Sequence, residues 1–249
     1  MNIFDLDIHR LWNTQLVEDE LTCLVANICY KVLEDPVLIK SKLVKPAVFH
    51  LLGCIIRKHN QSLGASLKLV QMLQHFEHLA LPVAEAVQLW VVTYKCKSLV
   101  SEILRELDHI PEKEFMRDGA STKTICSFIL ELARLLPDAV LINISLLLTR
   151  MDEESYLMRN SVLSVIGEII MQCLSKEGLD NQAKQARDQF LDILYDHANL
   201  DVNAFVRSRA LHIWLNLVSQ EHLPVKRCSE LAELCVRLLL DKSNLVRKV

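Results

Sequence analysis

Charged side chains recur at one fixed spacing in the second half of this 249-residue chain. In each copy an acidic residue is followed, after four others, by an apolar residue and an arginine. The acidic and arginine positions are Glu153 and Arg159, Asp201 and Arg207, and Asp241 and Arg247. A carboxylate beside a turn can cap the next helix, and a guanidinium one turn later can bind this or a neighbouring carboxylate. The spacing predicts a structural ladder of alternating charges rather than direct ligand contacts.

The interval between the arginines indicates the architecture that carries this ladder. Arg159 and Arg207 are 48 positions apart, and Arg207 and Arg247 are 40 positions apart. Helical-hairpin repeats of the HEAT/armadillo type have about this period. Such repeats stack into solenoids in which each unit contacts its neighbours, and their extended surfaces hold other molecules. We therefore expect a binding scaffold.

A second group of charges lies in residues 35–70, which hold six basic residues and one acidic residue. Candidate contacts for DNA or a partner are Lys40, Lys42, Lys45, Arg57 and Lys58, together with Arg209. Binding to a phosphate backbone requires clustered Lys and Arg. The cluster has no interleaved aromatic residues and the net charge is −3, so we expect weak, salt-sensitive DNA binding; solubility explains the cluster equally well.

Residue patterns that would indicate catalysis are missing. The chain has no Gly-rich phosphate loop, no Gly-x-Ser-x-Gly and no His-Glu-x-x-His. His75 and His78 could offer two metal ligands from one helical face, but the spacing suggests no third ligand. We therefore predict no catalytic residues, no cofactor, no metal and no small-molecule substrate.

The cysteines and tryptophans fit a packed intracellular core. Eight cysteines occur without a Cys-x-x-Cys motif, and Cys228 and Cys235 have the i, i+7 spacing of a core stripe. Six of them lie in apolar helical stretches and are predicted to be reduced core thiols in the cytosol or nucleus: Cys23, Cys29, Cys54, Cys126, Cys228 and Cys235. Trp12, Trp90 and Trp214 are predicted to pack rather than to stack on bases.

The sequence predicts helices along almost the whole chain. Hydrophobic residues make up 51% of it, whereas only five glycines and six prolines occur, below the average usage of about 7% and 5%. Apolar residues recur at helical spacing in residues 21–32, 46–56, 62–79, 82–94, 97–109, 121–136, 138–150, 154–174, 180–198, 203–219 and 224–240. These segments predict an all-α, HEAT/armadillo-type α-solenoid of about five to six helical hairpins.

Two further features concern the extent of the solenoid. No stretch without Asp, Glu, Lys or Arg exceeds eleven residues, whereas a membrane-spanning helix needs about 18 to 20, so we expect a soluble protein with no membrane contact. Residues 241–249 read as the start of another helix. We expect one continuous solenoid segment, 1–249, from a longer chain.

Several runs of residues also resemble the condensin complex subunit 1 family, the large HEAT-repeat regulatory subunits of condensin I. They are residues 10–13 (RLWN), 71–80 (QMLQHFEHLA), 158–160 (MRN), 187–192 (RDQFLD) and 201–209 (DVNAFVRSR). The run at 71–80 is the specific one, because the Val-Arg pattern would fit any HEAT protein.

The resemblance implies a regulatory scaffold in mitotic chromosome condensation. Members of this family join a kleisin, a second HEAT subunit and two SMC ATPases, and they help the complex to engage chromosomal DNA. For this chain we expect the contact with DNA to be weak or indirect. The implied location is the nucleus and the chromosome, with the cytoplasm in interphase. The alternative is an importin-like or trafficking adaptor that binds peptides. Ladders of exposed Trp and Asn residues on the inner face of the solenoid would favour this alternative.

Overall fold

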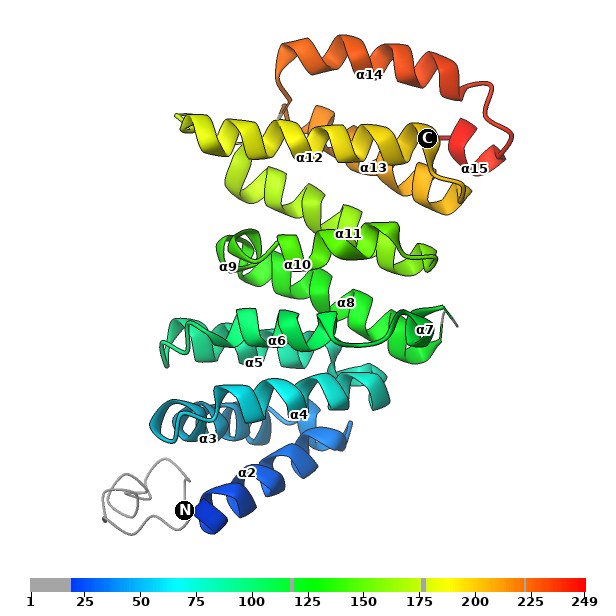
Figure 1. Ribbon diagram of the computed structural model, residues 1–249. Coiled ribbons are helices and arrows are strands. Elements are labelled where there is room, and N and C mark those ends of the chain that lie inside the picture. Colours follow the sequence, from blue (N-terminus) through cyan, green and yellow to red (C-terminus); the bar gives the residue numbers. More distant parts are fainter. Residues whose placement is uncertain (1–18, 117–118, 176–177, 222) are drawn as a thin grey trace.

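The helices of this protein stack one above another into an elongated array. The computed structural model describes residues 19–116, 119–175, 178–221 and 223–249. Figure 1 shows the array running from α2 near the N-terminus to α14 and α15 near the C-terminus. The described residues contain helices and turns but no strand, which confirms the predicted all-α helical solenoid. Trp12 and the other residues of the 10–13 run lie outside the described residues.

Most of the predicted helices are present with shifted ends. The longer α-helices are α2 (Asp19–Glu34), α3 (Val44–Lys58), α4 (Ser62–His75), α5 (Ala80–Val92), α6 (Leu99–Asp108), α8 (Ala120–Leu135), α11 (Tyr156–Ile169), α12 (Asn181–Leu200), α13 (Ala204–Ser219) and α14 (Val225–Leu238). The shorter ones are α7 (Glu112–Phe115), α9 (Pro137–Ile142), α10 (Ser145–Leu148) and α15 (Asn244–Arg247). Single turns of other helix types are η2 (Leu38–Lys40), η3 (Glu77–Leu79), η4 (Thr149–Asp152) and η5 (Ile170–Leu174).

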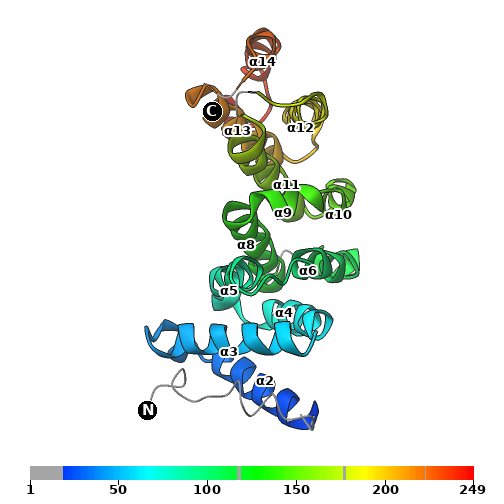
Figure 2. The same ribbon diagram turned by 90° about the vertical axis from the view of Figure 1, so that its left-hand side faces the viewer.

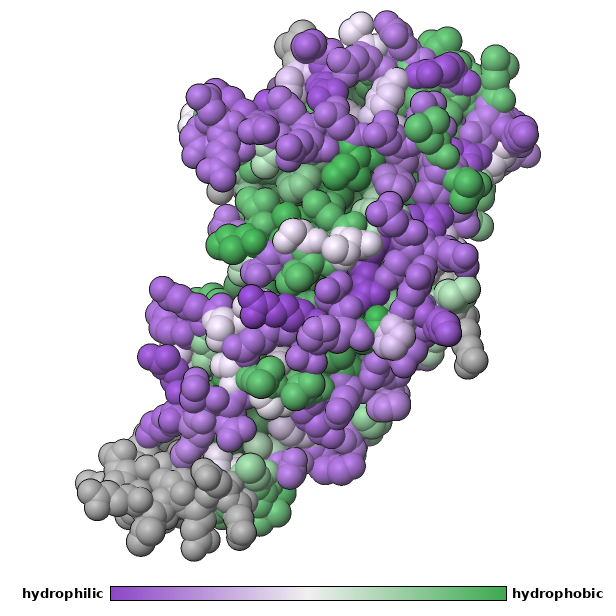
Figure 3. All heavy atoms as spheres, viewed as in Figure 1, coloured by the Kyte–Doolittle hydropathy of each residue, from purple (hydrophilic) through white to green (hydrophobic). Residues whose placement is uncertain are grey.

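These helices form two layers. Figures 1 and 2 place α4, α6, α10, α12 and α14 in one layer and α3, α5, α8, α11 and α13 in the other. In the second layer α5 packs on α8, α8 on α11 and α11 on α13. Figure 3 shows that hydrophilic side chains cover much of the first layer, with apolar groups in the interval between α10 and α12. The short α9 and α10 cover less of the second layer than the longer helices do.

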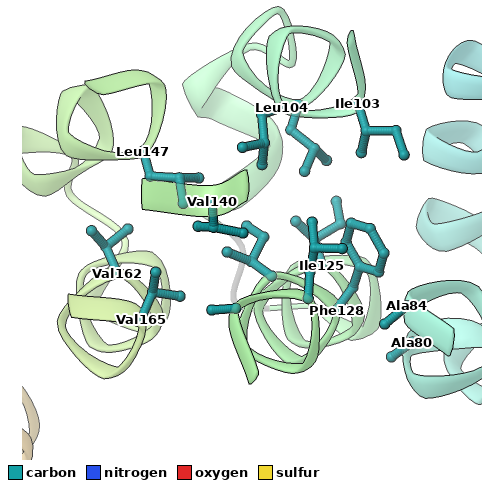
Figure 4. Close-up of a cluster of buried hydrophobic side chains, with 14 of the residues drawn as sticks. Ala80, Ala84, Ile103, Leu104, Ile125, Phe128, Val140, Leu147, Val162 and Val165 are labelled. Atoms are coloured by element: carbon teal, nitrogen blue, oxygen red, sulfur yellow. The ribbon is translucent and has the colours of Figure 1, made fainter. Parts of the chain in front are cut away.

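The centre of the array is a continuous apolar core. Figure 4 shows Val162 and Val165 of α11 facing Val140 of α9 and Leu147 of α10, with Phe128 of α8 on the far side. All five side chains are buried. A second-layer helix is covered by its own partner and by both neighbouring repeats, so α11 is apolar around most of its circumference.

This covering also explains the most hydrophobic segment of the chain. Residues 156–174 are long and apolar enough to cross a membrane by length and composition, with a mean hydropathy of 1.3. However, 67% of this apolar stretch is buried within the protein. The segment also contains Arg159, which is buried and hydrogen-bonded to carboxylate and carbonyl oxygens. Its hydrophobicity is therefore that of a core helix in this fold.

Two predicted helices are interrupted by local chemistry. The helix expected over 62–79 ends at His75, because Phe76 takes an extended conformation (φ −126°, ψ 101°). The helix expected over 138–150 is divided at Asn143, whose side chain donates a hydrogen bond to the carbonyl oxygen of Ala139 at 2.9 Å. A short polar side chain that bonds to nearby backbone competes with the regular helical pattern.

The interruption at Phe76 corrects the histidine prediction. His75 is the last residue of α4, whereas His78 lies in η3, so the two do not share one helical face. His75 is exposed, and His78 Nε2 lies 3.1 Å from the carbonyl oxygen of Leu33. Among the described residues, no group of three or more His, Cys, Asp or Glu side chains is arranged to hold a metal ion.

The prediction that the helical cysteines are core thiols is wrong for three of them. Cys29 is buried, but Cys23, Cys228 and Cys235 are exposed. Cys228 and Cys235 line an open groove of about 460 Å³ between α13 and α14. Their spacing does place them on the apolar stripe, but no described element covers that part of it. Trp90 and Trp214 are buried, which confirms their packing role.

Candidate functional site

The acidic ladder residues lie in the tight turns that connect the helices of each pair, and the ladder arginines lie in the helices that follow. The turns precede α11, α13 and α15, and each ladder arginine is the fourth residue of its helix. The caps of these three helices are Ser155, Asn203 and Ser243, whose side chains accept hydrogen bonds from backbone N–H groups in the first turn. Each cap stands two positions after the acidic residue. The expectation that the acidic residues themselves cap these helices is therefore wrong.

Asp201 and Asp241 stabilise their turns instead. Asp201 Oδ1 accepts a hydrogen bond from the backbone N–H of Asn203 at 2.8 Å, and Asp241 Oδ1 accepts one from Ser243 at 2.7 Å. Aspartate commonly bonds to its own backbone two residues on, where the side chain mimics a backbone turn. This contact leaves both carboxylates free to receive a further donor.

Arg159 supplies that donor to Asp201 from the preceding repeat. Its Nε and Nη2 atoms donate to Asp201 Oδ2 and Oδ1 at 2.9 Å and 3.0 Å. Its Nη1 atom donates to the carbonyl oxygens of Glu153 and Glu154 in its own turn, at 2.5 Å and 2.9 Å. A two-point arginine–carboxylate contact is strong and geometrically specific, so Arg159 joins one turn to the next.

Arg207 repeats this arrangement one unit later. It donates to both carboxylate oxygens of Asp241 at 2.8 Å and 2.9 Å, and to the carbonyl oxygen of Asp201 at 2.7 Å. Arg247 makes the corresponding contact to the carbonyl oxygen of Asp241 and also binds the side chain of Asn244. The structure thus places each ladder arginine between the carbonyl groups of its own turn and a second polar group.

Sequence reasoning missed a buried arginine that extends this row of contacts. Arg150 is 6% exposed. It donates to the carbonyl oxygens of Leu107 at 2.8 Å, Asp108 at 2.5 Å and Ile110 at 3.2 Å, and it pairs with Glu153. The signal in the sequence is the i, i+3 spacing of Arg150 and Glu153, but that spacing also occurs in many exposed helix pairs.

Burial and pairing shift the pKa values of these carboxyl groups in different directions. Burial alone would raise the pKa of Asp201, but hydrogen bonds from Arg159, the Asn203 N–H and His197 outweigh it and hold the pKa below its usual value. The hydrogen bond from Arg207 lowers the pKa of Asp241. Burial raises the pKa of Glu153, although Arg150 opposes the change. All three groups contact fixed partners, so the ladder has the chemistry of a structural clamp.

The basic candidates do not form one patch. Lys40, Lys42 and Lys45 line a single groove, whereas Arg57 and Lys58 lie in the last turn of α3. The twelve positions from Lys45 to Arg57 correspond to roughly 18 Å along the helix axis, at 1.5 Å per residue. Lys45 is further engaged by Glu85. Of the six candidates, Arg209 lies farthest along the chain, exposed on α13.

Comparison with known proteins identifies relatives of a single kind. Residues 1–65 match the model of the family described as non-SMC mitotic condensation complex subunit 1, N-terminal. Over 248 residues the chain is 43% identical to condensin complex subunit 1 of Mus musculus and 42% identical to that of Homo sapiens, covering 99% of this chain and 18% of each relative. The Xenopus laevis protein of the same name is 40% identical over 244 residues. The chain therefore spans about a fifth of the length of the curated relatives that it matches.

Proposed function

We propose that this chain, a homologue of condensin complex subunit 1, is a non-enzymatic HEAT-repeat scaffold segment that acts in mitotic chromosome condensation. The observation that carries this proposal is the 40–43% identity along almost the whole chain. The fold supports it, because a solenoid offers an extended surface on which other proteins can be held. The corresponding location is the nucleus and the chromosome.

The partners in this proposal are the other condensin subunits, in particular the kleisin and the SMC ATPases, alongside a second HEAT subunit. ATP hydrolysis belongs to the SMC partners. The guanidinium groups of Arg159 and Arg207 support such a division of roles, because both contact turns of the fold itself. Chromosomal DNA is engaged weakly, or through the partners.

The importin-like alternative has less support. An adaptor of that kind would present exposed tryptophans, with matching asparagines, along its inner face. Trp90 and Trp214 are instead buried, with exposures of 0% and 2%. The Trp90 indole N–H donates to the carbonyl oxygen of Phe49 at 2.7 Å, so this ring fixes two helices to each other rather than receiving a peptide.

Crosslinking in an assembled condensin I complex tests the scaffold role. Four lysines on different elements of the solenoid are exposed and a fifth is half-buried: Lys40, Lys123, Lys184 and Lys226, and Lys68. We expect mass spectrometry to find at least one of them linked to the kleisin or to an SMC subunit. The control is the same protein crosslinked without its partners, which identifies links within the chain. Absence of any link to another subunit would contradict the proposal and leave this segment as a spacer.

A further inference from the structure

We infer that the groove between α3 and α5 is a docking site for an acidic peptide segment that carries an apolar anchor residue. The groove has a volume of about 790 Å³, within the range of roughly 300–1,000 Å³ that is usual for ligand pockets. Figure 2 shows α3 and α5 as successive helices of the same layer. This inference deepens the proposed scaffold role, on which it rests for the source of the peptide.

The floor and walls of the groove are apolar. Phe49 and Ile39 are buried at its base, Leu89 is half-buried, and Leu81 is 47% exposed. Binding is favoured when a partner covers apolar surface that would otherwise face water. Leu81 and Leu89 therefore offer the contact for an apolar side chain.

Close packing behind the groove holds its shape. The indole N–H of Trp90 on α5 is bonded to the carbonyl oxygen of Phe49 on α3. At Gly53 an added Cβ would lie only 2.7 Å from Trp90 Cδ1 and 2.6 Å from Tyr94 Cδ2. These contacts set the separation of α3 and α5 before any ligand arrives, so binding requires little ordering of the groove.

The rim of the groove is positively charged. Lys40 and Lys42 are exposed, and Lys45 is held between the carboxylate of Glu85 and the ring of Phe49, whose centroid is 5.6 Å from Lys45 Nζ. With histidines neutral, these four charged lining residues sum to +2. The Lys45–Glu85 pair shows that a carboxylate fits at the edge of the apolar floor. A second carboxylate would meet two exposed lysines beside it.

A peptide fits this combination better than duplex DNA does. DNA phosphates could bind Lys40 and Lys42 but would leave Leu81 and Leu89 uncovered. The next basic pair, Arg57 and Lys58, is at the far end of α3. An acidic segment with one apolar residue uses both the rim and the floor.

Fluorescence anisotropy with a labelled short peptide of alternating aspartate and leucine tests the inference on the full chain. We expect binding that falls at least tenfold in the Lys40→Glu/Lys42→Glu double variant. The matched control is Lys123→Glu/Lys184→Glu, which makes the same charge change at exposed positions on α8 and α12 and should alter affinity less than twofold. A peptide with asparagine for aspartate, or alanine for leucine, should bind at least tenfold more weakly.

One variant is expected to act in the opposite direction. Glu85→Gln removes the carboxylate that occupies Lys45, so a peptide carboxylate gains a third lysine and affinity should rise severalfold. A variant that merely damaged the fold would not bind more tightly. Leu81→Ala should weaken binding severalfold, whereas Leu67→Ala, also exposed but outside the groove, should leave it unchanged.

Three results would overturn the inference. They are failure of the unchanged chain to bind the aspartate–leucine peptide, equal losses in the two double variants, and DNA that binds more tightly than the peptide with the same dependence on Lys40 and Lys42. The last result would assign the groove to nucleic acid. Because the peptide is measured without other condensin subunits, this inference can fail while the crosslinking experiment succeeds, and the reverse also holds.

Discussion

The ladder turns and the α3–α5 groove place similar charged groups in opposite situations. Arg159 and Asp201 have side chains only 8% and 3% exposed, and both guanidinium contacts to the carboxylate are near 3 Å. Lys40 and Lys42 are exposed at the edge of an open groove. The comparison teaches that, in this solenoid, buried charges stabilise the stacking of repeats, whereas exposed charges beside apolar surface remain available to partners.

The largest effect should follow the loss of Asp201, which accepts hydrogen bonds from Arg159 and from Asn203 and lies 3.0 Å from His197 Nδ1. Asp201→Ala leaves the Arg159 guanidinium buried without its carboxylate, which should cost about 3–5 kcal/mol of unfolding free energy. Chemical denaturation measures this. Asp196→Ala, an exposed site on α12, the helix that ends just before Asp201, should change stability by less than about 0.5 kcal/mol. Similar losses at the two positions would remove the distinction between ladder and surface charges.

The next effect should appear one repeat later. Arg207→Ala removes two contacts to Asp241 and one to the carbonyl oxygen of Asp201, and we expect a loss of about 1–3 kcal/mol. Arg209→Ala, two positions away and exposed, should stay within about 0.5 kcal/mol of the unchanged protein. Thermal unfolding of both variants checks this, and equal melting shifts would show that Arg207 is not part of a ladder.

The ladder should also be visible in the dependence of stability on pH. The pKa values of Asp201 and Asp241 lie below the ordinary value of 3.8. Their contribution is therefore complete above that value and is lost as pH falls through the lower folded values. The raised pKa of Glu153 acts in the opposite sense, because its contribution is complete below the ordinary 4.5 and is lost as pH rises through the folded value.

Denaturant titrations across this acid range test the assignment. We expect the unfolding free energy to fall as pH drops below about 3.8, and to fall less steeply in Asp241→Asn, which lacks one of the lowered groups. Asp196→Asn should retain the steepness of the unchanged chain, because Asp196 is exposed on α12. If the unfolding free energy falls equally steeply at low pH in both variants, the responsible carboxylates lie elsewhere.

The smallest effect concerns duplex DNA at the basic residues. Lys45 is already paired with Glu85, so Lys40, Lys42, Arg57 and Lys58 leave at most four phosphate contacts and a log-log salt slope no steeper than about −3.6. Binding should be nonspecific and should disappear when Lys40, Lys42 and Lys45 are reversed in charge. Filter binding at several salt concentrations measures the slope. Tight binding that survives the triple reversal would move the DNA contact to another surface.

Part of the ladder could be predicted from spacing alone. The intervals between Arg159, Arg207 and Arg247 indicated the repeat. The helix starts could also be predicted, because Ser155, Asn203 and Ser243 are residue types that commonly cap helices. The bonding of each arginine could not be predicted, because its own turn and the next were both within reach. The stacking offset decides this, and the structure directs the carbonyl contacts to the same turn and the carboxylate contacts of Arg159 and Arg207 to the next.

The groove depended on the tertiary structure to a greater extent. In the sequence, Lys40, Lys42 and Lys45 belong to the same basic segment as Arg57 and Lys58. In the structure the two groups lie at opposite ends of the long helix α3 and are therefore far apart. Nothing near Lys45 in the sequence indicates Glu85, which is forty positions away and reaches it only because α5 packs beside α3.

The sequence by itself determined the helical class, the repeat length and the positions of the ladder arginines, because helical periodicity and turn chemistry act over a few residues. The tertiary structure decided which charges pair, where the long predicted helices break, and which cysteines remain exposed. These outcomes depend on what covers each side chain. In a stacked solenoid the cover comes from residues about forty positions away, beyond the reach of any local pattern.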